Sequence, residues 1–196
     1  MRATRVRFAL LLACLWLALP ASAHVAPGQA AGLFSGLMHP ASGLDHVLAM
    51  VAVGLWGAQL GAPAIWLLPV TFPLVMACGG FLGLLGVALP GVEIGIASSA
   101  ILLGTLVATQ SRAPLWLAAV VVGFFAVFHG HAHGTELPPG QSGLLYSVGF
   151  VVATGCLHAA GVAIGWVHRW PWGQAALRVT GAAIAVAGVF FLWRAA

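Results

Sequence analysis

Long apolar segments, each near the length of a membrane-spanning helix, alternate with short polar breaks along the chain. Proline, glycine or charge marks every break, and these residues end or interrupt helices. The apolar segments cover residues 44–60, 64–89, 92–109, 114–128, 143–167 and 174–193. The pattern predicts an all-α fold, a polytopic membrane bundle with six transmembrane helices.

The first 23 residues have the pattern of a secretory signal peptide. Three arginines precede the apolar run 8–19, and the small residues Ala21 and Ala23 occupy the −3 and −1 positions of a cut after Ala23. We therefore expect a cleaved signal peptide at 1–23 and a single transmembrane domain at 24–196, with no soluble domain.

Composition supports a membrane protein and excludes a nucleic-acid partner. Hydrophobic residues make up 62% of the 196 residues and charged residues only 5%, which is too little charge to cover a soluble surface. The formal net charge of +4 includes three arginines of the signal peptide. Without them, four arginines remain against the three carboxylates Asp45, Glu93 and Glu136, which leaves one excess positive charge. A mature chain this close to neutral lacks the basic surface that nucleic-acid binding requires.

The remaining arginines predict the orientation of the bundle. A cleaved signal leaves the new N-terminus outside, so the breaks that carry Arg112, Arg169 and Arg178 face the cytoplasm, and only Arg194 lies outside. This distribution follows the positive-inside rule. We expect a protein of the bacterial inner membrane with a periplasmic mature N-terminus.

A first group of metal-binding side chains lies at the start of the first span. If the stretch is helical, His39 and His46 are two turns apart on one face with Asp45 beside them, and Pro40 takes the first helical position. Imidazole and carboxylate together bind nickel, zinc, cobalt or copper(II). The alternative is a pair of interfacial histidines at a helix N-terminus, where Asp45 is stabilised by the helix dipole.

A second group follows the fourth span. His129 and His133 are one helical turn apart, and Glu136 lies a further turn on if the helix continues. A solvated histidine-rich loop is the alternative. On the predicted topology both groups fall on the periplasmic side, which favours one shared metal site over two unrelated turns.

Four further residues are secondary candidates. Glu93 begins the third span and is either a ligand or an interfacial anchor, and His131 lies between the two main histidines. His158 lies at membrane depth, where ionisable groups mark ion pathways or are hydrogen-bonded structural residues. Cleavage after Ala23 would make His24 the first residue, able to chelate through its amine and imidazole if a flexible segment 25–38 folds back over the site. The alternative is that His24 follows the cleavage site by chance and binds no metal.

These motifs resemble the HupE/UreJ family. Residues 39–56 contain His39, five residues and then Asp45-His46, and residues 128–136 match the second family motif; residues 90–97 and 157–161 are similar too. The resemblance spans essentially the whole mature chain. It implies a secondary nickel permease encoded with hydrogenase or urease accessory functions. It also ranks His131, at a variable motif position, below its neighbours.

Residues and resemblance together predict secondary transport of Ni²⁺, with Co²⁺ as an alternative ion. We expect no enzyme activity and no permanently bound cofactor, and the partners are the metal ion and the lipid bilayer, with a homo-oligomer left open. The chain contains no lysine and no Walker A loop to power transport by ATP. The alternatives are a non-transporting metal sensor or accessory protein, a haem-binding electron-transfer protein, and an intramembrane hydrolase using Ser98 or Ser99 with His158.

Overall fold

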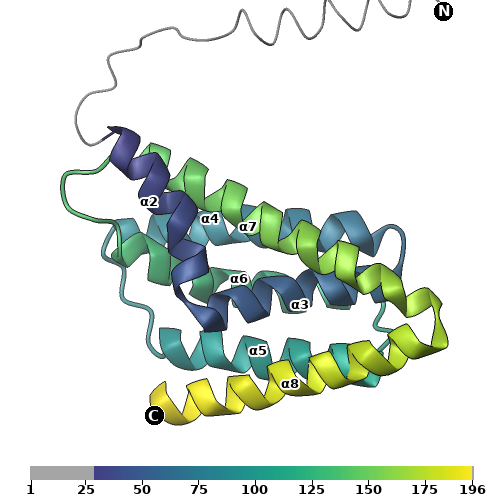
Figure 1. Cartoon of the computed structure of the whole chain (residues 1–196). Helices are drawn as coiled ribbons and strands as arrows, with labels where there is room; N and C mark the ends of the chain where they lie inside the picture. The colour runs from purple at the N-terminus through teal and green to yellow at the C-terminus, as the bar shows by residue number, and fades with distance from the viewer. Residues whose placement is uncertain (1–28, 196) are drawn as a thin grey trace, which may run out of the picture.

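Residues 29–195 are described by the computed structural model, and they are helical almost throughout (Figure 1). This part of the chain contains no strand, which confirms the all-α class. The predicted signal peptide at 1–23 and His24 lie outside the described residues. The helices are α2 (Gln29–Ser42), α3 (Leu44–Leu60), α4 (Ala64–Leu84), α5 (Val92–Thr109), α6 (Leu115–Thr135), α7 (Gly143–Gly165), the short 3-10 helix η1 (Trp166–Arg169) and α8 (Pro171–Ala195).

Five of these helices are long and apolar enough to cross a membrane: α4, α5, α6, α8, and α7 together with η1. A sixth span exists if α2 and α3 are counted as one broken span, because they meet at 82° across a single residue. The described residues thus hold five to six candidate spans, which supports the predicted membrane bundle.

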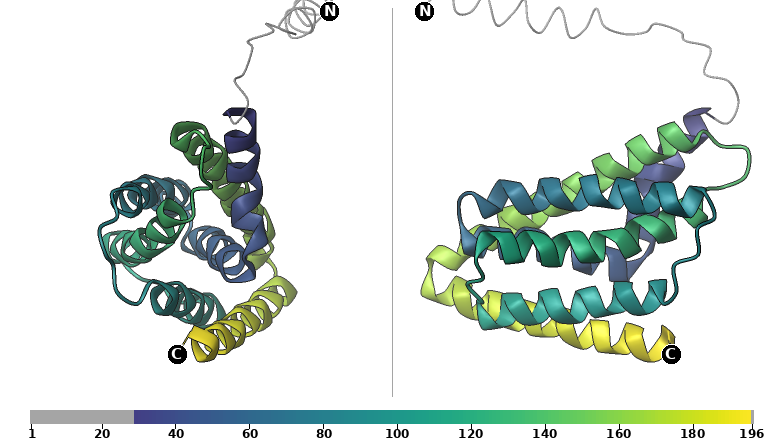
Figure 2. Two further views of the ribbon diagram at one scale, coloured as in Figure 1. Left: turned by 90° about the vertical axis from the view of Figure 1, so that its left-hand side faces the viewer. Right: turned by 180° about the vertical axis from the view of Figure 1, so that it is seen from behind.

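Glycines bring the helices of this bundle into close contact. α4 lies along α6, α5 along α8, and both α2 and α3 along α7, with α3 enclosed by its neighbours (Figure 2). A Cβ on Gly54 of α3 would overlap the carbonyl oxygen of His158 on α7, and a Cβ on Gly104 of α5 would lie 2.6 Å from the backbone nitrogen of Ala185 on α8. Such small-residue contacts drive helix association in lipid, where apolar burial contributes little.

The helix α2 corrects two expectations about the N-terminal segment. Residues 29–38 are helical rather than a flexible segment, and His39 with Pro40 lies in the last turn of α2 rather than at the start of the first span. The reason is packing: a Cβ on Gly36 would overlap the carbonyl oxygen of Tyr146, so this face of α2 lies directly on α7. Pro40 has no backbone N–H to bond the carbonyl of Gly36, and α2 ends two residues later, at Ser42.

Two other helix ends differ from the prediction by five residues or more. α4 ends at Leu84, before the predicted 89, because Gly86 adopts a left-handed φ of 70° just beyond it. α6 continues past 128 to Thr135, so the second histidine group is helical and buried rather than a solvated loop. The boundaries of α3 and α5 match the prediction at both ends.

Charged side chains separate to the two ends of the bundle. At the end we call the arginine end, Arg112 and His168 line one polar cavity and Arg178 approaches Gln110. At the opposite end, Asp45, Glu93 and Arg194 line another cavity. Arg112 and Arg178 therefore lie at one end of the bundle, and the positive-inside rule predicts that this end faces the cytoplasm.

The orientation gives a direct test. We expect alkaline phosphatase fused to the C-terminus of the chain to be active, and green fluorescent protein fused there to be dark, because the positive-inside rule predicts that α8 ends on the periplasmic side. Fusions made in the break at Arg112 serve as the matched control and are expected to show the opposite pair of signals. A fluorescent C-terminal fusion would reverse the predicted orientation.

Candidate metal centre

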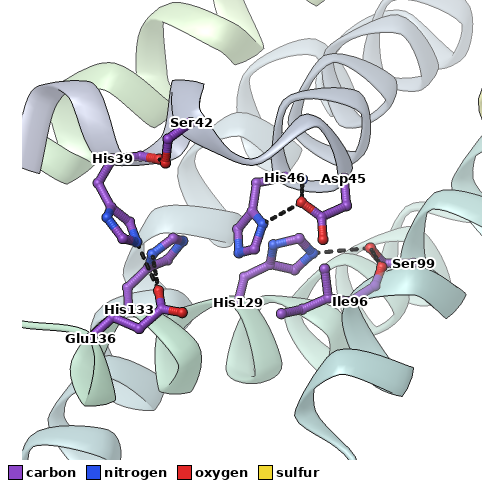
Figure 3. A network of polar contacts seen from close by, with 9 residues as sticks. All are labelled: His39, Ser42, Asp45, His46, Ile96, Ser99, His129, His133 and Glu136. Carbon is purple, nitrogen blue, oxygen red and sulfur yellow. Dashed lines mark hydrogen bonds and ion pairs between the residues drawn. The ribbon is translucent and has the colours of Figure 1, made fainter. Parts of the chain in front are cut away.

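Side chains from three helices converge at the end of the bundle opposite the arginine end (Figure 3). The last turn of α2 supplies one histidine, the first turn of α3 a histidine and an aspartate, and the end of α6 two histidines and a glutamate. We call this group the histidine cluster; its members are His39, Asp45, His46, His129, His133 and Glu136. The structure therefore brings together all six residues that the two sequence groups predicted.

His133 occupies the middle of the cluster. Its ring centroid lies 4.7 Å from that of His39 and 4.6 Å from that of His46, and His46 lies 4.8 Å from His129. His39 and His46 reach His133 from two directions because the chain turns at Gly43, which has an extended backbone. The expectation that these two residues share one helical face was therefore wrong, although both contribute to the same group.

A metal-sized group of donor atoms lies at the outer edge of the cluster. One ligand atom each from His39, His133 and Glu136 lies within 4.8 Å of the other two. Bonds of about 2.0–2.2 Å to a metal require donor atoms roughly 3 Å apart. Small rotations of these side chains would close the group around an ion.

Glu136 supplies negative charge to this group. Its Oε2 accepts a hydrogen bond from Nε2 of His39 at 2.8 Å and lies 3.9 Å from Nδ1 of His133. The hydrogen bond from His39 lowers the pKa of the Glu136 carboxyl below its ordinary value, although partial burial opposes the shift. Glu136 is therefore an anion near neutral pH, placed beside two imidazoles.

Asp45 orients the ring of His46 through hydrogen bonds. Its Oδ1 accepts hydrogen bonds from the backbone nitrogen of His46 at 2.8 Å and from the ring Nδ1 at 2.9 Å. An ionised carboxylate only accepts, so Nδ1 of His46 carries the proton and Nε2 holds a lone pair. A side chain on Gly43 would crowd this pair, since its Cβ would lie 2.8 Å from Asp45 Oδ1 and 3.0 Å from His46 Nδ1.

Several ring nitrogens of the cluster are buried with no hydrogen-bond partner among the described residues. They are Nε2 of His46, Nδ1 of His129 and both nitrogens of His133. Each buried unsatisfied polar group costs about 1–3 kcal/mol. A bound cation would offset part of that cost, because the lone pair of a neutral imidazole is a metal ligand.

Comparison with known proteins decides the family. The family model described as HupE / UreJ protein matches residues 12–191 of the chain. The chain belongs to the HupE/UreJ family. Protein HupE of Rhizobium leguminosarum bv. viciae is 49% identical over 177 residues, which cover 90% of this chain and 93% of that protein. No solved structure matches the chain.

Membership confirms the resemblance inferred from the two motifs. In this HupE/UreJ protein those motifs supply all the side chains of the histidine cluster, the first from α2 and α3 and the second from α6. Residues far apart in the sequence, such as His39 and Glu136, contact one another because the chain turns by 82° between α2 and α3.

Two secondary candidates lie outside the cluster. Glu93, in the first turn of α5, is exposed and shares a cavity of about 330 Å³ with Asp45 and Arg194. It therefore neighbours the cluster through Asp45. His131 is buried but donates from Nε2 to the backbone carbonyl of Val87 at 2.7 Å, where it holds the connection between α4 and α5.

His158 lies deeper in the bundle and is fully buried. The ring of Phe72 stands between it and the cluster: its centroid is 5.2 Å from His158 and 5.3 Å from His129. Both ring nitrogens of His158 lack a hydrogen-bond partner among the described residues. The backbone of Pro69, on α4, makes a weaker polar contact with the ring.

α7 contributes one side of the site, and of its residues there the sequence predicted only His158. Tyr146, Phe150, Thr154 and His158 are all buried, and their spacing of four residues places them on one face of the helix. The Phe150 ring lies 3.9 Å from that of His133, and the Tyr146 ring 5.7 Å from that of His39. The repeat of polar and aromatic residues at this spacing was the available signal.

Ser99 also has a role that the sequence alone did not predict. The hydrolase alternative paired it with His158, but the structure places its hydroxyl 3.0 Å from Nε2 of His129. The hydroxyl bonds the backbone carbonyl of Ile96 at 2.6 Å. A nucleophilic serine would instead donate its proton to the histidine that acts as base.

Proposed function

We propose that this HupE/UreJ protein carries Ni²⁺ across the inner membrane by secondary transport and so supplies hydrogenase or urease maturation. The observation that carries the proposal is the histidine cluster itself, where four imidazoles and two carboxylates meet at one end of an apolar helix bundle. All three carboxylates of the chain lie at that end.

The donor set suits a divalent transition metal. Neutral imidazoles and carboxylates together replace the hydration shell of nickel or cobalt, whereas calcium and magnesium prefer oxygen ligands alone. Asp45 and Glu136 offset the positive charge in a region where an unpaired charge is costly. Co²⁺ is the alternative ion because it accepts the same ligands.

The buried face of α7 extends from the cluster toward the interior. Tyr146 and Phe150 flank the rings of His39 and His133, and the unpartnered groups of Thr154 and His158 follow at greater depth. We assign His158 as a second resting position for the ion. Phe72 separates the rings of His129 and His158, so an ion that passes directly between these two histidines requires the Phe72 ring to move. Binding at each position must remain weak enough for release.

Purified protein in liposomes tests the proposal. Uptake of radiolabelled nickel into these vesicles is expected to exceed uptake into protein-free vesicles, to saturate, and to be inhibited by excess cobalt. His168→Ala is the matched control, because this histidine lies at the arginine end, bonded to the Gly165 carbonyl. Nickel binding without uptake would identify a metal sensor or accessory protein, and absence of both would reject the proposal.

A further inference from the structure

A buried hydroxyl lies behind one ring of the histidine cluster. Ser99, on α5, is fully buried. Its Oγ lies 2.6 Å from the backbone carbonyl oxygen of Ile96 and 3.0 Å from Nε2 of His129 (Figure 3). The hydroxyl therefore links α5 to α6 at the edge of the cluster, and it makes no hydrogen bond to the other five cluster residues.

The position of the single hydroxyl hydrogen follows from these two contacts. A carbonyl oxygen only accepts, so the 2.6 Å contact with Ile96 is a hydrogen bond only if Ser99 donates to it. The Ser99 oxygen then accepts from His129, and Nε2 of His129 carries the ring proton. In a neutral imidazole the other nitrogen, Nδ1, must hold the lone pair.

The ring of His129 neighbours that of His46, which also holds a lone pair without a partner. Nδ1 of His129 is buried without a hydrogen-bond partner among residues 29–195, and so is Nε2 of the neighbouring His46. Asp45 sets the tautomer of His46 as Ser99 sets that of His129, in each case through an acceptor on the ring nitrogen that carries the proton. Two acceptor nitrogens cannot bond each other, whereas a cation satisfies both.

We propose that Ser99 is a positioning residue for the transported ion: it fixes His129 as the Nε2–H tautomer and so makes Nδ1 the ligand atom. Groups that hold the second nitrogen of a metal-binding histidine fix its tautomer and orientation and raise its basicity. The inference rests on the proposed function for the identity of the ion, but the tautomer of His129 is a property of the metal-free protein.

The first measurement is nitrogen NMR of metal-free protein labelled with ¹⁵N-histidine, with the His129 signals assigned by their loss in His129→Ala. At a pH of about 8, above the ordinary imidazole pKa, we expect His129 to show a protonated, hydrogen-bonded Nε2 and an unprotonated Nδ1. Ser99→Ala is expected to shift the Nε2 signal and broaden both, and Ser99→Thr, which keeps the hydroxyl, to restore them. A protonated Nδ1 in the unmodified protein would overturn the proposal.

The second measurement is nickel binding by calorimetry to the same variants. Ser99→Ala is expected to weaken binding by about 10- to 100-fold, as is typical when a group behind a metal ligand is lost, and Ser99→Thr to recover most of it. Ser98→Ala is the matched control and is expected to bind normally. Weakened binding in Ser99→Ala with an unchanged His129 spectrum would show a packing role instead. If the unmodified protein binds no nickel, the proposed function fails while the spectrum still decides the tautomer.

Discussion

His133→Ala is expected to abolish most nickel uptake while the protein remains folded in the membrane. His133 is the only cluster residue whose ring lies within 5 Å of both His39 and His46, so its loss separates the α2 and α3 ligands from each other. Changes behind a metal ligand already cost about 10- to 100-fold in affinity, and loss of this central ligand is expected to cost at least as much. The measurement is the initial rate of radiolabelled nickel uptake into vesicles at limiting nickel.

Uptake by variants at other positions shows whether the loss is confined to the histidine cluster. His46→Ala is expected to reduce uptake to a similar degree, because its free Nε2 belongs to the cluster interior. His168→Ala and Arg169→Lys, both at the arginine end, are expected to leave the rate unchanged. Near-normal uptake by His133→Ala at equal protein content would mean that the cluster does not capture the ion.

Hydrophobic segment length predicted most of the bundle. The boundaries of α3 and α5 agree with the expectation because strong breakers, Gly61 to Pro63 before α4 and Pro90-Gly91 before α5, border their apolar runs. The helix α2 was missed for the opposite reason. It contains several small residues and Pro40 near its end, and it is stabilised by contact with α7 rather than by any local signal.

The cluster was predictable in membership but not in geometry. Helical spacing correctly placed His129 and His133 on one face and left His131 on another. The 82° turn between α2 and α3, which aims His39 at Glu136, depends on tertiary contacts that no spacing reveals. Ser99 was singled out for the wrong chemistry, since its partner on α6 is visible only once the helices are assembled.

Gly130→Ala is expected to destabilise the folded protein strongly. This residue lies between the two main histidines of α6, where α4 crosses, and a Cβ there would overlap the carbonyl oxygen of Met76 and lie 2.8 Å from the backbone nitrogen of Gly80. Overpacking typically costs about 1–3 kcal/mol, and backbone atoms cannot rotate away as a side chain can. We expect a loss at the upper end of that range, measured as a lower Tm in detergent.

A matched glycine on α7 separates this steric effect from helix propensity. Gly155 also lies inside a helix, but a Cβ there meets no atom within 4 Å. Gly155→Ala is therefore expected to stabilise the protein slightly, by about 0.5–1 kcal/mol, since alanine favours a helix over glycine.

Forcing α4 away from α6 also moves His129 and His133 relative to α3, so Gly130→Ala is expected to weaken nickel binding as well. Equal Tm values for the two variants would mean that α4 and α6 do not approach each other as closely as the cluster requires.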